Sequence, residues 1–453
     1  MKTLIFLLAL MVALPVHAGN DKDIAAYMSG DYAATSVLAE QGYARAQFSL
    51  GLMYQDGRGV VQDEAEAVKW FRRAAEQGLA LAQNNLGVMV EHGRGVAKDE
   101  AEAVKWYRKA AEQRDVRAQN NLGAMYKEGR GVFRDEREAV KWFRKAAEQG
   151  YSPAQYNLGV VYQSGLWLKK DSTDAEKWFR KAAGQGYVVP QARIGVFYEG
   201  GPNAGKDEVE AAKWFRKAAD QGNADAQGNL GALSETGRGL AKDEAEAIKW
   251  YLKAAEQGNA AAEFNLGAMH QQGHGFAKDE SEAFKWFRKA AERGSALAQN
   301  RVGYMFQNGL GVGKDEAEAV QWYRKAADQD LVLAQFNLGK LYGRGAGVKQ
   351  DEVEAAKWMR KAAKQGFVFA QNSLGELLEA GRGAAKDEAE AADWYREAAE
   401  QGFPPAQYNL GRLYESGQGV AKDEAEALNW YRKAAGNGAL QAADALARLA
   451  QHH

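Results

Sequence analysis

Tryptophan recurs along this chain at a fixed spacing, and that spacing constrains the fold more than any other feature. Eleven of the 12 tryptophans stand 36 residues apart, and a series of glycines has the same spacing. The tryptophans are Trp70, Trp106, Trp142, Trp178, Trp214, Trp250, Trp286, Trp322, Trp358, Trp394 and Trp430, and the glycines run in the same steps from Gly51 to Gly411. A fixed period of this length indicates repeats that each pack on their neighbours.

One unit, residues 79–114, illustrates the repeat. Apolar residues at helical spacing over residues 82–89 predict a first helix. We expect Gly93 to end it, because glycine readily adopts the positive φ of a helix C-cap. Asp99 is predicted to cap a second helix, with Glu102 completing an acidic capping box. The predicted fold is all-α, an α/α superhelical solenoid of about eleven 36-residue helix-turn-helix repeats.

The repeated glycine and tryptophan have a packing interpretation. A glycine inside a helix costs about 1 kcal/mol relative to alanine, so Gly51 and its equivalents are expected to let another helix approach closely. A tryptophan ring buries on the order of 150–250 Å², which makes it the largest hydrophobic contributor available. We therefore expect both series to lie in the packed core.

The repeat resembles a known family, and the last unit carries the motif well. Its residues are Ala406, Leu410, Gly411, Tyr414, Gly417, Gly419, Asp423, Ala427, Trp430, Lys433 and Ala434. This pattern resembles the Sel1-like repeat, a relative of the tetratricopeptide repeat, over residues 43–438. The resemblance implies first helices that line a concave face and an adaptor role in protein complexes. In exported bacterial members it implies work in envelope assembly, signalling or host contact.

The two ends of the chain differ from the array. Residues 1–18 have the pattern of a secretory signal peptide, with Lys2, an apolar run over residues 4–14 and a small-residue cleavage site, so we expect export. The periplasm is the favoured destination, and secretion is the alternative. Residues 19–42 are expected to form a degenerate N-terminal capping unit, and residues 439–453 a C-terminal capping helix and tail.

No pattern in the sequence indicates catalysis or a cofactor. Cysteine is absent, and acidic residues recur in every unit where a catalytic pair would need a unique pocket. His270 and His274 lack further ligands at metal-binding spacing. The net charge of −1 gives no electrostatic footprint for nucleic acid, and no segment after the leader is apolar enough to span a bilayer. We expect no enzyme, cofactor or metal; an unrecognised hydrolase site is the least favoured alternative.

Arginine recurs in ten of the eleven units at the position of Arg72. These arginines form either a basic recognition ladder or, as we favour, a solvated outer face. In the second case, Glu–Arg and Glu–Lys pairs three and four residues apart each add about 0.2–0.5 kcal/mol.

Partner binding is expected at positions where the repeats differ. The column that contains Phe48 alternates aromatic and amide side chains, which either contact a partner or fill space between helices. The column that starts at Leu52 becomes polar toward the C-terminal end. Trp167, outside the tryptophan series, is either a contact residue or a plug between units, and two arginines replace the usual asparagine. The residues predicted to bind a partner are Phe48, Tyr156, Trp167, Arg193, Phe264, Arg301, Phe336, Lys340, Tyr408 and Arg412.

The sequence thus predicts an exported scaffold that binds partner proteins of the envelope or extracellular space through the concave face of the solenoid. The alternative is a module that binds carbohydrate or cell-wall peptidoglycan through its aromatic residues.

Overall fold

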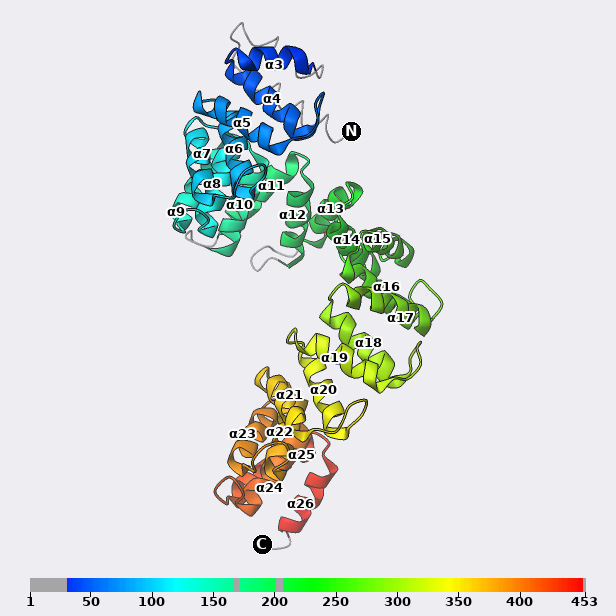
Figure 1. The fold of residues 1–453 in the computed structure, drawn as a ribbon. Helices are drawn as coiled ribbons and strands as arrows, with labels where there is room; N and C mark the ends of the chain where they lie inside the picture. Colours follow the sequence, from blue (N-terminus) through cyan, green and yellow to red (C-terminus); the bar gives the residue numbers. More distant parts are fainter. Residues whose placement is uncertain (1–30, 166–170, 201–206, 451–453) are drawn as a thin grey trace. The chain divides into compact units, whose positions relative to one another are not determined.

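The computed structural model describes residues 31–165, 171–200 and 207–450, which contain 24 helices and no strand (Figure 1). The predicted all-α helix-turn-helix solenoid is confirmed. The chain divides into two compact units, unit 1 over residues 1–221 and unit 2 over residues 222–453. The predicted leader and Trp167 lie outside the described residues.

Unit 1 consists of α3 to α13, and each helix packs against the next along the chain. The bounds are α3 (Tyr32–Glu40), α4 (Ala44–Asp56), α5 (Glu64–Glu76), α6 (Ala80–His92), α7 (Glu100–Glu112), α8 (Val116–Glu128), α9 (Glu136–Glu148), α10 (Ser152–Ser164), α11 (Ser172–Gly184), α12 (Val188–Gly200) and α13 (Glu208–Asp220).

Unit 2 continues the alternation from α14 to α26. The bounds are α14 (Ala224–Thr236), α15 (Glu244–Glu256), α16 (Ala260–Gln272), α17 (Glu280–Glu292), α18 (Ala296–Asn308), α19 (Glu316–Ala327), α20 (Val332–Arg344), α21 (Glu352–Lys364), α22 (Val368–Ala380), α23 (Glu388–Glu400), α24 (Pro404–Ser416), α25 (Glu424–Gly436) and α26 (Leu440–Ala450). Even-numbered helices from α4 are the first helices of the repeats, and the odd-numbered helices that follow them are the second helices. Among the described helices, none combines the length and apolar character that crossing a membrane requires.

The predicted helix ends are mostly confirmed. Gly93 ends α6 with φ 67°, and the Asp99 carboxylate accepts a hydrogen bond from Glu102 N–H at the start of α7. The capping-box prediction for the Glu102 side chain is wrong. Asp99 N–H already donates to the carbonyl of Val90, at 3.0 Å, so it needs no carboxylate. The Glu102 carboxylate instead accepts from Trp106 and from Arg72 of the preceding repeat.

The glycine of the first helix receives an aromatic ring in ten of the eleven repeats, as the packing interpretation predicts, and Gly339 meets Met359 instead. At Gly51 an added Cβ would lie 2.7 Å from the ring of Phe71, which is fully buried. The residue after the tryptophan is therefore more buried than the tryptophan in ten of the eleven repeats, whereas the sequence pointed to the tryptophan as the main core residue. Trp358 of α21 packs in a cluster with α20 of its own repeat and α19 of the preceding repeat, so the tryptophans join consecutive repeats.

Candidate partner-binding surface

The aromatic residues of the Phe48 column lie against the rings at the centre of their own repeats. Phe48 is 9% exposed, with its ring centroid 5.6 Å from that of Phe71. The other pairs of this kind are Tyr156–Phe179, Phe264–Phe287 and Tyr408–Tyr431, at 5.8, 5.1 and 5.6 Å, and Tyr156, Phe264 and Tyr408 are partly buried. This geometry supports the space-filling interpretation for these four residues, and partner contact through them stays a prediction.

Asparagines of the Phe48 column accept hydrogen bonds from asparagines of the following first helix. Asn121 of α8 donates through Nδ2 to Asn84 Oδ1 of α6 at 3.1 Å. Equivalent bonds join Asn157 to Asn120, Asn337 to Asn300 and Asn409 to Asn372. These amides hold neighbouring repeats in register.

The cations predicted to contact a partner also have neighbours within the protein. Arg193 donates to Gln163 Oε1 at 2.8 Å, and Arg301 donates to Gln271, the equivalent residue of another repeat. Lys340 Nζ lies 5.4 Å from the centroid of the Phe336 ring. All three cations are half-buried, and their role in partner binding stays a prediction.

Arg412 joins α24 to α22 in a partly buried hydrogen-bond network. It donates to Glu379 Oε2 at 2.5 Å, and the same oxygen accepts from Tyr395 O–H at 3.1 Å. Hydrogen bonding to Glu379 raises the pKa of Arg412. Burial, followed by the charge of Glu379, raises the pKa of Tyr395. This arrangement stabilises the contact between two repeats and leaves Arg412 half-buried.

Phe336 differs from the other members of its column, because its neighbours are rings at the starts of two helices. Phe367 precedes α22, Phe369 lies in its first turn, and Phe403 precedes α24. Their centroids form a chain, with 5.2 Å between Phe336 and Phe367, 5.3 Å between Phe367 and Phe369, and 4.9 Å between Phe369 and Phe403. We call these four residues the phenylalanine strip.

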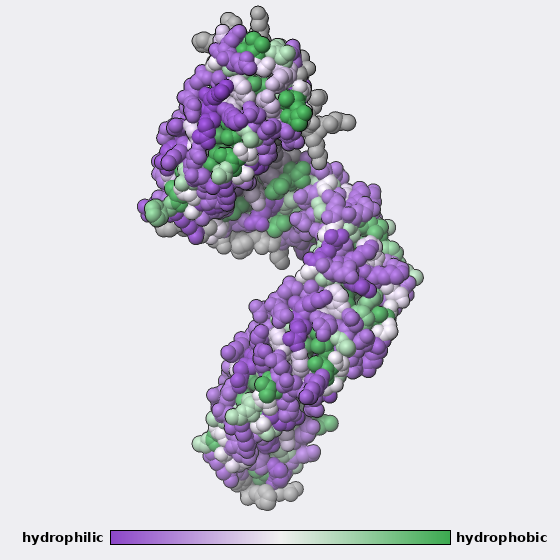
Figure 2. All heavy atoms as spheres, viewed as in Figure 1, coloured by the Kyte–Doolittle hydropathy of each residue, from purple (hydrophilic) through white to green (hydrophobic). Residues whose placement is uncertain are grey.

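The phenylalanine strip is partly open to solvent. Phe369 is 48% exposed, and Leu333, in the first turn of α20, is 44% exposed. The face of the molecule in Figure 2 is mostly hydrophilic, with hydrophobic residues in small separate patches. A run of partly exposed rings on such a surface is typical of a protein contact site.

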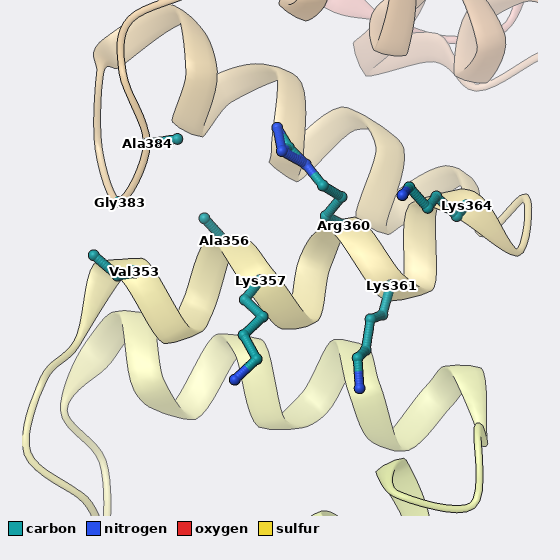
Figure 3. A pocket seen from close by; sticks show the side chains of 8 residues that line it. All are labelled: Val353, Ala356, Lys357, Arg360, Lys361, Lys364, Gly383 and Ala384. Carbon is teal, nitrogen blue, oxygen red and sulfur yellow. The ribbon is translucent and has the colours of Figure 1, made fainter.

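A shallow hollow of about 360 Å³ lies beside α21 and is lined mainly by cations (Figure 3). Lys357 and Lys361 extend from one side of the helix and Arg360 from the other. Lys357 bonds Glu354 at 2.7 Å, Arg360 bonds Glu390 at 2.9 Å, and Lys361 lies over the ring of Trp358. Because these cations have internal partners, the hollow does not present them as a free anion site.

The sequence profile of the Sel1 repeat matches eleven segments, which together run from residue 44 to residue 438 with one short gap. The chain belongs to the Sel1 repeat family. Sel1 repeat solenoids are generally protein-interaction scaffolds, and they are typically non-enzymatic.

Two solved structures of Sel1 repeat proteins are similar to this chain over most of its length. The crystal structure of c5321, a protective antigen present in uropathogenic Escherichia coli strains, is 38% identical, with a TM-score of 0.63 over 93% of this chain and 90% of that one. A Sel1 repeat protein from Oxalobacter formigenes is 32% identical, with a TM-score of 0.53 over 74% of this chain and 99% of that one. No curated protein matches the chain.

One feature of these Sel1 repeats that was not predicted from the sequence is a glutamine pair, present in nine of the eleven repeats. Gln113, after α7, donates to Gln83 Oε1 of α6 at 2.8 Å, and Gln83 donates to the carbonyl of Ala75. In one repeat the pair becomes Arg293 and Glu263, a buried carboxylate. The sequence signal for this pair was the recurrence of glutamine at the positions of both Gln83 and Gln113 in most repeats.

The sequence analysis also missed Phe367, Phe369 and Phe403. It followed the Phe48 column, whereas these residues stand at the start of the first helices. For Phe367 and Phe403 the sequence signal was a change at the position before the first helix, which is polar at Asn223, Asn259 and Ser295. Only the structure shows that the strip includes Phe336.

The Arg72 column forms contacts between Sel1 repeats. Arg72 Nη1 bonds Glu102 at 2.8 Å, and Arg108 bonds the hydroxyl of Tyr126 at 2.6 Å, so both join one repeat to the next. Lysines of the same helices form the short-range pairs that were predicted, such as Lys69 with Glu66. These contacts favour a structural role for the column over a recognition ladder.

Proposed function

We propose that this Sel1 repeat protein is an exported scaffold that binds partner proteins through the phenylalanine strip of α20, α22 and α24. The observation that carries the proposal is the run of ring contacts from Phe336 to Phe403, with Phe369 about half exposed. Aromatic side chains are enriched in the buried centres of protein interfaces.

The chemistry of the strip favours an apolar protein segment over a sugar. Phenylalanine carries no hydrogen-bonding group, whereas a sugar ring needs several polar partners once it leaves water. A protein side chain such as leucine or proline has no such need. The glycan alternative remains an outcome that the same experiment tests.

Export is the second part of the proposal, and it rests on the signal-peptide pattern of residues 1–18. The likeness to c5321, which is described as a protective antigen, is consistent with it. Cell fractionation of the full chain, with N-terminal sequencing of the exported product, is the test. A mature start near Gly19 outside the cytoplasm is the expected result, and retention of the intact leader in the cytoplasm would contradict export.

The binding test compares three forms of the mature chain as bait for an envelope extract. Phe369→Ser removes the most exposed ring of the strip. Val353→Ser is the matched control, because Val353 is 65% exposed on α21 and makes the same apolar-to-polar change away from the strip.

We expect the parent chain and Val353→Ser to retain the same protein and Phe369→Ser to lose it. Equal retention by all three forms would contradict binding through the strip. Retention of peptidoglycan in place of any protein, lost in Phe369→Ser, would favour the glycan alternative.

A further inference from the structure

The tryptophans of the second helices carry cations on their rings, with one exception. In ten repeats the residue three positions after the tryptophan is lysine or arginine, and its charged group lies 3.9–4.5 Å from the ring centroid. Trp250 with Lys253 is one such pair. A cation over an indole face is attracted by the negative charge density of the ring.

The exception is Trp394 of α23, where the residue three positions later is Glu397. The preceding residue is also acidic, since Asp393 replaces the lysine that eight other repeats carry there. In some of those repeats this lysine also approaches the ring, as Lys141 does at 5.9 Å from Trp142. At Trp394 both positions that elsewhere supply a cation therefore supply a carboxylate.

The cations near α23 have other partners. Arg396 bonds Asp393 at 2.8 Å, and Arg360 of α21 bonds Glu390 at 2.9 Å. Within the part of the chain that the structure describes, no cation lies over the Trp394 ring. The ring itself is fixed in place, because its Nε1 donates to Glu390 at 3.1 Å.

Among the described residues, no ion pair to Glu397 compensates the charge beside this ring. Glu397 accepts a hydrogen bond from the neutral amide of Gln371, at 2.8 Å, which leaves its negative charge in place. Glu400, one turn later, is exposed. The whole of α23 holds five carboxylates against one arginine, whereas α21 holds two carboxylates against four cations.

We propose that Trp394, with Glu397 one turn after it, binds a lysine or arginine side chain from a basic segment of another protein. The ten other repeats define the chemistry, since each holds an ammonium or guanidinium group at the equivalent place. The Glu397 carboxylate complements the charge of that group, and the ring provides the face on which it lies. This site lies on a second helix, whereas the phenylalanine strip belongs to first helices and to the residues just before them.

The test is the titration of the full chain with a short fluorescein-labelled peptide of alternating lysine and glycine, followed by fluorescence anisotropy at low salt. Glu397→Lys places the protein's own cation over Trp394, as in the ten other repeats. We expect it to weaken peptide binding by about tenfold or more, because it removes one attraction, adds a repulsion and occupies the ring. Glu397→Gln should have an intermediate effect, because it removes the charge and leaves the ring open.

The matched control is Glu256→Lys, which makes the same charge change at an exposed position of α15 in the same unit. We expect this control to bind nearly as the parent chain does. Equal weakening in Glu256→Lys and Glu397→Lys would show a general charge effect and overturn the site. Absence of peptide binding to the parent chain would also overturn it. Circular dichroism melts establish that each variant is folded, and Glu397→Gln decides the outcome if Glu397→Lys is not.

Discussion

The first helices of unit 2 begin in two different ways. In the capped group, α14, α16 and α18, the residue before the helix is polar and its side chain accepts a hydrogen bond from the backbone N–H three residues on. In the uncapped group, α20, α22 and α24, that residue is apolar and makes no such bond. The capping residues are Asn223, Asn259 and Ser295, and the apolar ones are Leu331, Phe367 and Phe403.

This difference teaches that a repeat can give up a helix cap without losing the helix. An N-cap is worth about 1 kcal/mol, yet α22 and α16 are both 13 residues long. Packing of the apolar face supplies most of the stability of such short helices. The position before the helix is therefore free to carry an aromatic ring, and in the uncapped group it carries part of the phenylalanine strip.

The largest expected effect tests whether the repeats of the capped group and those of the uncapped group have the same kind of core. Trp250 of α15 is 4% exposed and Trp358 of α21 is 3% exposed. Trp250→Ala and Trp358→Ala should each lower the free energy of unfolding by about 3–5 kcal/mol, as other large core truncations do. Thermal melts of the full chain measure both. An unchanged melt for either variant would contradict the packing of the tryptophan between repeats.

The next effect concerns the glycines that receive a ring. A Cβ at Gly375 of the uncapped group would lie 2.6 Å from the Tyr395 ring, and one at Gly267 of the capped group 2.8 Å from the Phe287 ring. Gly375→Ala and Gly267→Ala should each cost about 1–3 kcal/mol through overpacking. Gly436→Ala, in the last turn of α25 with open space around it, is the control and should be neutral or stabilising. A neutral Gly375→Ala would indicate a looser core in the uncapped group.

Alkaline pH should weaken both groups through their buried tyrosines. Burial and a neighbouring carboxylate raise the pKa of two tyrosines on second helices. Tyr251 lies on α15, which follows α14 of the capped group, and Tyr395 lies on α23, which follows α22 of the uncapped group. Because the folded-state pKa is raised, this contribution to stability is complete below the ordinary pKa of about 10 and is lost as the pH rises above it. Each tyrosine should lose about 1.4 kcal/mol per pH unit in that range.

Melts between about pH 9 and 11 measure this loss. Tyr251→Phe and Tyr395→Phe should each reduce the loss by a similar amount. A reduction in only one variant would show that the two groups differ in the core as well as at the helix starts.

The smallest expected effect addresses the caps themselves. Asn259 Oδ1 accepts from Ala262 N–H at 2.9 Å, so Asn259→Ala should cost about 1 kcal/mol. Chemical denaturation detects a change of this size, and capture of a partner by the phenylalanine strip should not change. A cost near zero would mean that a cap adds little stability even where it is present. The two groups would then differ only in their aromatic residues.

Much of each repeat could be predicted because the determining residues are close in sequence. The cap at Asp99, the turn at Gly93 and the ring-receiving glycine at Gly51 all follow from local backbone rules and helix spacing. The candidate surface was predicted less well. Phe336 was identified, but Phe367 and Phe369 were not, because they stand about 30 residues further along the chain.

The sequence by itself determined the repeat, its period, its helix pairs and its membership of the Sel1 family, because each depends on a local pattern repeated eleven times. Tertiary structure decided which side chains are occupied by contacts within the protein and which remain exposed to a partner. It placed Phe48 on Phe71, bound Arg412 to Glu379, and assembled the phenylalanine strip from three helices. The physical reason is that exposure and partner choice depend on packing between helices, whose contacting residues are far apart along the chain.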